Sequence, residues 1–525
     1  MLKKIISLCI SSLLCIQANS TYASPSEDSS SQSRAPLILH TNENAIKERF
    51  IVVFKHPKSL RSDTQSIQSF TNNTVTALSE SLSITSDSIF NHSISGFTAD
   101  LNVQQIEQLR HDPRIDFIEQ DKKITIDPII STESITSDTT WGLDRIDQRY
   151  LPLDNNYSPL FDGTGVTAYV IDTGVNIEHI EFGGRATSGF DFIDNDTDTT
   201  DCNGHGTHVA GTIGGQRYGV AKNVNIVGVR VLNCSGSGTI SSVIAGVDWI
   251  TANASGPSIA NMSLGGGQSL ALDKAVENAI QSGISFFLAA GNDNQDACNA
   301  SPARVTSGVT VGSTNRSDSR STFSNWGNCV DIFAPGSQIT SAWYDGGYRT
   351  ISGTSMATPH VAGVAAMYLQ ENRNLTPNNI SLLLTKRASI NKVFDTRDTA
   401  NHFLYALSDI ECLDNCEPKP QPVPLRELIS GLPLKGLSDS QHNKRYFYVD
   451  VEAGRPLTVQ TIGGEGDADL YVRFGKKPER HEWDCRPYRT QNNETCTINS
   501  TKKGRYYIML NAFSDYRDLS LQANY

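Results

Sequence analysis

Nearly continuous apolar segments alternate with helical segments over the central part of the chain. From about Trp141 onward the apolar segments include VTAYVID, NIVGVRVL, IANMSL, ISFFLAA and GVTVG. Between them, SSVIAGVDWI and ALDKAVENAI repeat apolar residues at the spacing of a helix with a buried face. Apolar strands separated by helices indicate a parallel sheet covered on both faces. We therefore predict a three-layer α/β domain whose ligands bind at the carboxyl ends of its strands.

The two flanking regions have other patterns. RFIVVFK (49–55), GFTADL and IDFIEQDKKITI predict strands, and VQQIEQLR (103–110) predicts a short amphipathic helix, so a small α+β domain without cysteine precedes the sheet. It ends in the polar segment STESITSDTT, which has the character of a cleavable joint. After a linker rich in proline at 418–427, the short alternating segments RYFYVDV, LTVQTI, ADLYVRF and RYYIMLNA predict a β-sandwich over 428–525.

Residues 1–23 have the organisation of a secretory signal peptide. Lys3 and Lys4 precede an apolar run from Ile5 to Ile16, and Thr21 and Ala23 are small residues placed for cleavage. That run is too short to cross a membrane, and no later segment reaches the roughly 20 apolar residues that a span requires. We expect a secreted, extracellular protein with no membrane partner.

Composition and charge narrow the class of protein. The chain has 525 residues, of which 38% are hydrophobic and 19% charged, as in a globular protein with several domains. Its net charge of -12 argues against a nucleic-acid partner. Cys9 and Cys15 leave with the signal peptide, and the eight remaining cysteines indicate disulfides in an exported chain. The residues alone leave all 105 pairings open.

Three residues of complementary chemistry follow apolar segments or open helices. Asp172 ends AYVIDTG, His205 lies in the glycine-rich DCNGHGTHVAGT, and Ser355 opens the helix of GTSMATPHVAGVAA, with Pro359 expected in its opening turns. A histidine can remove the proton of a serine hydroxyl, and a buried carboxylate can hold that imidazole in the required tautomer. Taken singly, each residue has a structural alternative, because Asp172 and Ser355 could cap helices and His205 could be a turn residue.

The motifs VIDTG, NGHGTHVAGT and GTSMATPHVAGVAA, in this order, resemble the subtilisin-like serine peptidases, most closely the branch of proteinase K and aqualysin. The resemblance covers almost the whole chain. Residues 24–133 are similar to a propeptide, with its inhibitor-like part at 49–126. Residues 134–417 are similar to the peptidase domain, and 428–525 to a bacterial pre-peptidase C-terminal domain.

The resemblance also implies roles for residues around the three motifs. Asn292 would donate from its side chain to the oxyanion, although from the residues alone it would be a turn residue after Gly291. A substrate would add as a strand between two segments and reach an uncharged first pocket, so cleavage after apolar or aromatic residues is expected. The residues expected to bind substrate are Gly236, Gly238, Ser263, Leu264, Gly265, Ala289 and Gly291.

Disulfides and calcium sites are implied in the same way. The expected pairs are Cys202 with Cys234, Cys298 with Cys329, Cys412 with Cys416, and Cys485 with Cys496. Structural calcium would be held at three places: by Asp191 and Asp196; by Asp144, Asp147, Gln148, Asp154 and Asn156; and by Asp331 with the carbonyls of Thr306 and Gly308. For the acidic segment DFIDNDTDTTD, a solvated loop is the alternative.

We therefore predict a secreted serine endopeptidase of broad specificity that matures by cutting its own precursor near Ser134. Its partners would be protein and peptide substrates and its own propeptide as an intramolecular inhibitor, and the enzyme would be a monomer. The C-terminal domain would bind insoluble protein or polysaccharide, and its Trp483 and Tyr488 are either exposed for this or part of its core. The competing hypothesis is a binding protein with an inactive peptidase scaffold. The presence of all four residues, Asp172, His205, Ser355 and Asn292, argues against it.

Overall fold

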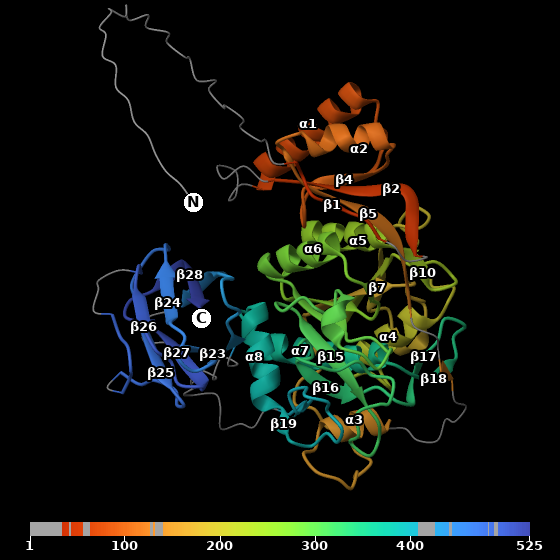
Figure 1. Cartoon of the computed structure of the whole chain (residues 1–525). Coiled ribbons are helices and arrows are strands. Elements are labelled where there is room, and N and C mark those ends of the chain that lie inside the picture. The colour runs from red at the N-terminus through yellow and green to blue at the C-terminus, as the bar shows by residue number, and fades with distance from the viewer. Residues whose placement is uncertain are drawn as a thin grey trace, which may run out of the picture. The chain divides into compact units, whose positions relative to one another are not determined.

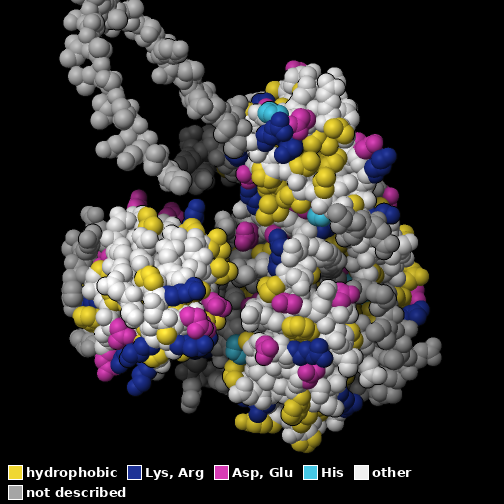
Figure 2. Space-filling model, viewed as in Figure 1, with side chains coloured by type: hydrophobic (Ala, Val, Ile, Leu, Met, Phe, Trp, Pro, Cys, Tyr) yellow, Lys and Arg dark blue, Asp and Glu magenta, His cyan; other side chains and the backbone are white. Residues whose placement is uncertain are grey.

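A computed structural model describes residues 34–40, 44–55, 64–126, 130–131, 140–407, 426–439, 444–480, 482–487 and 492–525. The chain forms two compact units, Met1–Ser408 and Asp409–Tyr525 (Figure 1). Within the described ranges, no helix is both long and apolar enough to cross a membrane. Among the described residues on the face shown in Figure 2, Lys and Arg side chains are interspersed with Asp and Glu.

The centre of the first unit is the predicted parallel sheet. Its strand order is β19-β20-β16-β15-β13-β11-β7-β9-β8, and every pairing except β19 with β20 is parallel. The strands are β7 (Thr167–Asp172), β8 (Ala186–Asp191), β9 (Asn225–Arg230), β11 (Ser258–Met262), β13 (Ser285–Ala289), β15 (Val309–Thr314), β16 (Ile332–Pro335), β19 (Ser389–Ile390) and β20 (His402–Phe403).

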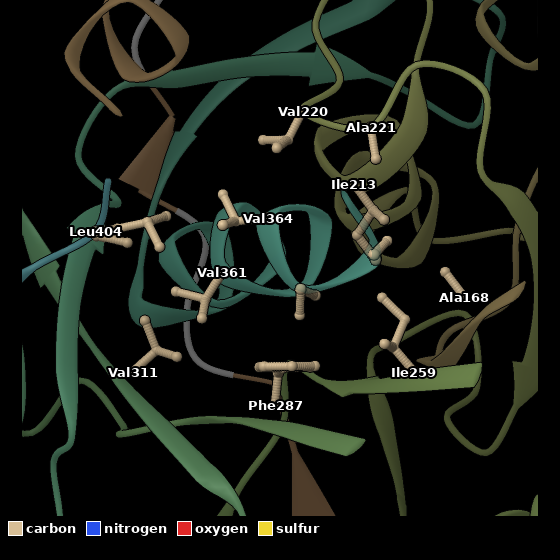
Figure 3. Close-up of a cluster of buried hydrophobic side chains, with 14 of the residues drawn as sticks. Ala168, Ile213, Val220, Ala221, Ile259, Phe287, Val311, Val361, Val364 and Leu404 are labelled. Atoms are coloured by element: carbon tan, nitrogen blue, oxygen red, sulfur yellow. The ribbon is translucent and has the colours of Figure 1, made fainter. Parts of the chain in front are cut away.

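Helices cover both faces of this sheet, which confirms the predicted three layers. One core joins strands to α4 (His205–Gly214), α7 (Thr354–Glu371) and α8 (Pro377–Arg387). Figure 3 shows Phe287 and Val311 of the sheet beside Val361 and Val364 of α7 in this core. A second core lies on the opposite face under α5 (Ile240–Asn253) and α6 (Leu270–Gln281). The short helix α3 (Trp141–Ile146) precedes the first strand of this sheet in the chain.

The region before the peptidase folds as the predicted α+β domain. Its sheet has the order β1-β5-β2-β4-β3 and carries α1 (Thr64–Leu82) and α2 (Val103–Arg110). The strands are β1 (Leu37–Ile38), β2 (Ala45–Phe54), β3 (Ser86–Phe90), β4 (Gly96–Asp100) and β5 (Ile115–Thr125). Along β2, Val52 belongs to the core beneath the two helices, whereas Ile51 and Val53 belong to the core shared with α5 and α6. The alternation of a strand therefore joins the propeptide to the peptidase.

The second unit is a β-sandwich, as predicted for its sequence. One sheet has the order β21-β23-β27-β25 and the other β22-β28-β24-β26. The strands are β21 (Arg426–Glu427), β22 (Leu434–Asp439), β23 (Lys444–Val451), β24 (Leu457–Ile462), β25 (Ala468–Phe474), β26 (Thr495–Ile498), β27 (Gly504–Ala512) and β28 (Tyr516–Asn524). Since β21 pairs with β23, the first sheet begins two residues before the predicted domain start at 428.

Three of the expected disulfides are present. They join Cys202 to Cys234, Cys298 to Cys329 and Cys485 to Cys496. The fourth expected pair, Cys412 with Cys416, lies outside the described residues, as do the predicted signal peptide and most of the proline-rich linker. Trp483 is half-buried, and Tyr488 also lies outside the described residues.

Candidate active site

Asp172 and His205 meet at the carboxyl end of the sheet. Asp172 is the last residue of β7 and His205 the first of α4, and Oδ1 of the fully buried Asp172 lies 2.8 Å from Nδ1 of His205. The same oxygen accepts a hydrogen bond of 2.8 Å from the Thr173 backbone. A Cβ on Gly206 would clash with the Gly174 carbonyl, so glycine is required for this close approach. The contact fixes which imidazole nitrogen faces the carboxylate.

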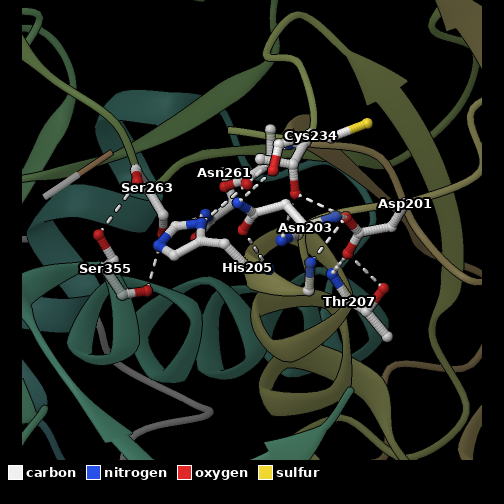
Figure 4. Close-up of polar contacts among 12 residues, drawn as sticks. Asp201, Asn203, His205, Thr207, Cys234, Asn261, Ser263 and Ser355 are labelled. Carbon is white, nitrogen blue, oxygen red and sulfur yellow. Dashed lines mark hydrogen bonds and ion pairs between the residues drawn. The ribbon is translucent and has the colours of Figure 1, made fainter. Parts of the chain in front are cut away.

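Ser355 lies at the start of α7, beside the His205 ring (Figure 4). Its hydroxyl donates to the Ser263 carbonyl at 3.0 Å, and the Ser263 hydroxyl donates to the Ser355 carbonyl at 2.8 Å. Pro359 explains the second bond. It is the sixth residue of α7, not one of the first four whose N–H groups lack a helical partner anyway, so the proline leaves the Ser355 carbonyl without its usual donor. Pro359 therefore lies in the opening turns, as expected, and the Ser263 hydroxyl supplies the bond that the proline removes.

The Asn292 amide is held against the residue before Ser355. Oδ1 of Asn292 accepts from the Thr354 backbone N–H at 2.9 Å and from the Thr354 hydroxyl at 3.0 Å. Its Nδ2 is turned toward Gly353: a Cβ atom at that position would lie 3.3 Å from Nδ2. The amide hydrogens therefore lie on the side of the helix N-terminus where an anion would be stabilised.

A buried carboxylate that the sequence interpretation placed only in an acidic loop organises the His205 turn. Asp201 accepts from the backbone N–H groups of Asn203, Gly204 and Thr207 at 2.9 Å each. Burial raises the pKa of Asp201, and these hydrogen bonds lower it. Asn203 donates to the Cys234 carbonyl at 3.0 Å, which ties the turn to the segment before strand β10 (Ser237–Thr239) (Figure 4). An aspartate three residues before a helix-opening glycine was the signal for such a cap.

A propeptide strand lies where the sequence analysis expects a substrate. β5 pairs antiparallel with β10 (Ser237–Thr239), with Ile124 opposite Gly238, and Ile126 donates to the Gly236 carbonyl at 2.9 Å. On its other side, Thr125 bridges to Gly265. Further along, β6 (Ile130–Ser131) pairs with β18 (Tyr348–Ser352), the strand that leads to Ser355. Strand pairing thus holds the chain at 123–125 and again at 130–131.

Three buried charged residues of β5 strengthen this interface. Asp121 accepts from the Ser241 hydroxyl at 2.6 Å in the first turn of α5, and Glu119 accepts from the Ala271 N–H at 2.8 Å in the first turn of α6. Lys122 donates to the carbonyls of Gly267 and Gln268. Burial raises the pKa of Asp121 and lowers that of Lys122. The propeptide therefore caps two peptidase helices at their positive ends.

The residues predicted to line the first pocket lie at the end of β13 and just after it, and none of them is charged. Ala289 ends that strand, Ala290 is fully buried in a small apolar cluster, and Gly291 has φ of +99°. Leu264 is also buried, in the core beneath α5 and α6. Two other histidines of the motifs, His208 and His360, are buried and bonded to backbone carbonyls, as expected for packed residues. Burial lowers their pKa values to about 3 and about 4.

The residues expected to bind calcium differ in how well they fit an ion. In the described part of the chain, no group of three or more His, Cys, Asp or Glu side chains is arranged to hold a metal. Asp191 is engaged by Arg230 and by the backbone N–H groups of Ile193 and Asp194, while Asp196 caps Asp198. Asp191 thus already has a positively charged partner in Arg230, and the role of Asp191 and Asp196 as calcium ligands stays a prediction.

In the second set, oxygen atoms of Asp144 and Gln148 lie close together, because both accept from the Asp154 N–H. Burial, together with the negative charges of Asp154 and Asp144, raises the pKa of Asp147 to about 6. Asp154 also lies against Gln148, whose Oε1 accepts its N–H, and Asn156 donates its N–H to Asp154. Burial raises the pKa of Asp331 to about 7; Thr310 donates to it at 2.8 Å, two residues beyond Gly308. Oxygen sets of this kind suit Ca²⁺.

A carboxylate-bound imidazole beside a serine at a helix N-terminus is the arrangement of a serine hydrolase, and the adjacent strand-binding edge suits a peptide substrate. Residues 163–407 match the Subtilase family, residues 49–127 the Peptidase inhibitor I9 family, and residues 444–512 the bacterial pre-peptidase C-terminal domain. The chain belongs to the subtilase family and is a subtilisin-like serine protease with an inhibitor propeptide.

Relatives are similar over different shares of the chain. It is 60% identical over 534 residues to the alkaline serine exoprotease A of Vibrio alginolyticus, covering 100% of both chains. It is 52% identical over 322 residues to an extracellular serine proteinase of Thermus sp. (strain Rt41A), covering 61% of this chain and 77% of that protein. The crystal structure of a cold adapted subtilisin-like serine proteinase is 76% identical with a TM-score of 0.52, covering 52% of this chain and 100% of that one.

Proposed function

We propose that the chain is the precursor of a secreted endopeptidase in which Ser355 is the nucleophile. His205 takes the hydroxyl proton and returns it to the leaving amine, and Asp172 stabilises the imidazolium that forms. The tetrahedral oxyanion is stabilised by the Ser355 backbone N–H and by Nδ2 of Asn292. The observation that carries this proposal is the 2.8 Å contact between Asp172 and His205 beside Ser355.

Substrates bind as the propeptide strand does. A peptide that replaces β5 pairs with Gly236 and Gly238 on one side and with Ser263, Leu264 and Gly265 on the other. Because backbone groups make most of these contacts, many sequences are accepted. Ala289 and Gly291 carry no charge, so apolar or aromatic side chains are preferred in the first pocket.

Export, maturation and ion binding complete the proposal. Residues 1–23 direct export, residues 24–133 are the inhibitory propeptide, and cleavage near Ser134 releases a monomeric enzyme. Structural Ca²⁺ is held by two sets of residues, where its charge offsets the mutual repulsion of the carboxylates. The sets are Asp144, Asp147, Gln148, Asp154 and Asn156, and Asp331 with the carbonyls of Thr306 and Gly308.

The C-terminal sandwich, in turn, binds insoluble protein or polysaccharide. Its support is a hydrophobic core of its own and a proline-rich connection to the peptidase. Binding is measured by co-sedimentation of the Ser355→Ala chain, with and without residues 428–525, with insoluble collagen and with chitin. Equal sedimentation of the two chains would refute this part.

The deciding experiment compares the exported wild-type chain with Ser355→Ala by intact mass and by casein digestion. We expect the wild type to be shortened near residue 134 and to digest casein, and the variant to stay full length and inactive. If both chains mature alike and neither digests protein, the catalytic proposal is wrong and the C-terminal domain becomes the place to look for function.

A further inference from the structure

Asn325 is a fully buried polar residue. None of the contacts of Asp172, His205 and Ser355 described above involves it. It lies in the connection between β15 and β16. Its position is fixed from that side, because the Ser324 hydroxyl donates to the Asn325 carbonyl at 2.9 Å and accepts from Ser313 of β15 at 3.0 Å. A buried amide without a bonding role would be costly, so its partners indicate what it does.

Those partners are the backbone groups on both sides of Asn292. Nδ2 of Asn325 donates to the Ala290 carbonyl at 2.8 Å, and its backbone N–H donates to the Gly291 carbonyl at 2.9 Å. Oδ1 of Asn325 accepts from the N–H groups of Asp293 and Gln295, both at 3.0 Å. Four backbone groups that flank Asn292 are thus bonded to one residue.

The backbone of this loop has no regular structure of its own that could replace these bonds. Gly291 has φ of +99°, a conformation that favours glycine, and a Cβ there would clash with Nδ2 of Asn325. On the other side, Thr354 holds Oδ1 of Asn292. The loop is therefore fixed from two directions: Thr354 orients the Asn292 amide, and Asn325 fixes the backbone that carries it.

We propose that Asn325 is a positioning residue for the oxyanion site: it holds the loop 290–295 so that Nδ2 of Asn292 meets the developing negative charge. The inference rests on the proposed role of Asn292. A donor displaced by a fraction of an ångström loses transition-state stabilisation, whereas the strand contacts of the substrate at Gly236 and Gly265 stay in place. Loss of Asn325 therefore lowers kcat more than it raises KM.

The test combines Asn325 and Asn292 variants in the full chain. Asn325→Ala and Asn325→Asp are each made in the wild-type chain and with Asn292→Ala. Asn325→Asp keeps the size of the side chain, but it replaces the donor to the Ala290 carbonyl by an oxygen atom and adds a buried negative charge. Two rates are measured: the first-order self-shortening of the precursor by intact mass, which needs no added substrate, and kcat and KM of the matured enzyme on a soluble peptide anilide.

A matched control comes from Asn315, another loop residue, whose Oδ1 also accepts from two backbone N–H groups, those of Ser317 and Ser319. The turn 315–319 carries none of the proposed site residues, so we expect Asn315→Ala to keep wild-type kcat. For Asn325→Ala we expect kcat and the self-shortening rate to fall about 10- to 100-fold with KM changed less than about threefold. With Asn292→Ala, itself expected to cost about 100- to 1000-fold, the further loss should be below about threefold.

Two results separate failure of the inference from failure of the proposed function. An equal loss on removing Asn325 in both backgrounds, or unchanged kcat in both Asn325 variants, would show that Asn325 does not act through Asn292. Wild-type kcat in the Asn292→Ala chain would instead remove the oxyanion role of Asn292, and the inference with it.

Discussion

Nδ1 of His205 lies 2.8 Å from Oδ1 of Asp172, at the junction of β7 and α4. Both side chains are buried, and the carboxylate oxygen also accepts from the Thr173 backbone. This contact assigns the proton on the imidazole to Nδ1, so that in the proposed mechanism Nε2 accepts the proton from Ser355.

Replacing Asp172 by asparagine should keep the distance to His205 but no longer hold the imidazole in the tautomer with its proton on Nδ1. The amide introduced by Asp172→Asn can donate to Nδ1 of His205, so Nε2 carries the proton and cannot act as a base. We expect this variant to lower kcat about 10⁴-fold on a peptide anilide and to slow self-shortening correspondingly. Asp194→Asn, at an exposed carboxylate, is the control and should stay active. A wild-type rate for Asp172→Asn would contradict the assigned roles.

The Cys202–Cys234 disulfide should support both stability and substrate binding. It joins two cysteines separated by 32 residues in the sequence. In the chain-entropy treatment, closing a loop of this length adds about 3–4 kcal/mol to the free energy of unfolding. The double variant Cys202→Ser/Cys234→Ser should therefore show a lower unfolding midpoint, and also a higher KM because Asn203 bonds to the Cys234 carbonyl beside β10. In the Cys485→Ser/Cys496→Ser control, KM should not change. An unchanged KM in the Cys202→Ser/Cys234→Ser variant would show that the disulfide does not support substrate binding at β10.

Stability should fall as the pH is lowered through the range of free histidine. His208 and His360 have pKa values lowered by burial to about 3 and about 4, against about 6.5 in the unfolded chain. Below about pH 6.5 the unfolded state therefore binds protons that the folded state does not. The free energy of unfolding should then decrease by about 1.4 kcal/mol per pH unit for each histidine.

Chemical denaturation of the Ser355→Ala chain between about pH 8 and 4.5 measures this slope. His360→Leu should reduce it by about 1.4 kcal/mol per pH unit over the lower part of the range. His111, whose side chain is 47% exposed, supplies the control variant His111→Gln, which should leave the slope unaltered. The same slope in all three chains would contradict the effect of burial.

Removing Asp121 should weaken the propeptide as an inhibitor. Asp121→Ala leaves the N–H and hydroxyl of Ser241 buried without this acceptor, at a cost of about 1–3 kcal/mol, or about 5- to 150-fold in the inhibition constant. Inhibition of the mature enzyme by added propeptide measures the change. Glu107→Ala, on the exposed side of α2, should inhibit like the wild type. Equal inhibition constants for the two variants would show that the cap does not contribute.

Removal of calcium should shorten the lifetime of the mature enzyme. A chelator empties the proposed sites, so their loops open more often and are cut by neighbouring enzyme molecules, and the half-life at elevated temperature falls. Asp331→Asn should have a short half-life already and gain less from added Ca²⁺, whereas Asp345→Asn, at a half-exposed side chain, should respond like the wild type. If Asp331→Asn responds fully, its carboxylate is not a ligand.

Much of the fold could be predicted because its causes are local. The helix at 103–110 has the predicted bounds, since a capping box at Asn102 and Gln105 begins it and its apolar residues share one face. Helix α1 was not predicted, because its sequence is rich in Ser, Thr and Asn, which have low helix propensity. It is stabilised by burial of Val75 and Leu78 against the sheet of the propeptide.

The sequence by itself determined the order of the domains and the types of side chain at the site. Both could be predicted because the strand and helix patterns and the three motifs each depend on residues close together in the sequence. Only the tertiary structure decided what meets across the chain. It brought Asn325 into hydrogen bonds with the backbone beside Asn292. It also paired the Ser263 hydroxyl with the carbonyl that Pro359 leaves without a helical donor, and Asp191 with Arg230. Such contacts join residues far apart in sequence. Each forms because a buried polar group needs a partner after packing, and a local sequence pattern does not show which partner it will find.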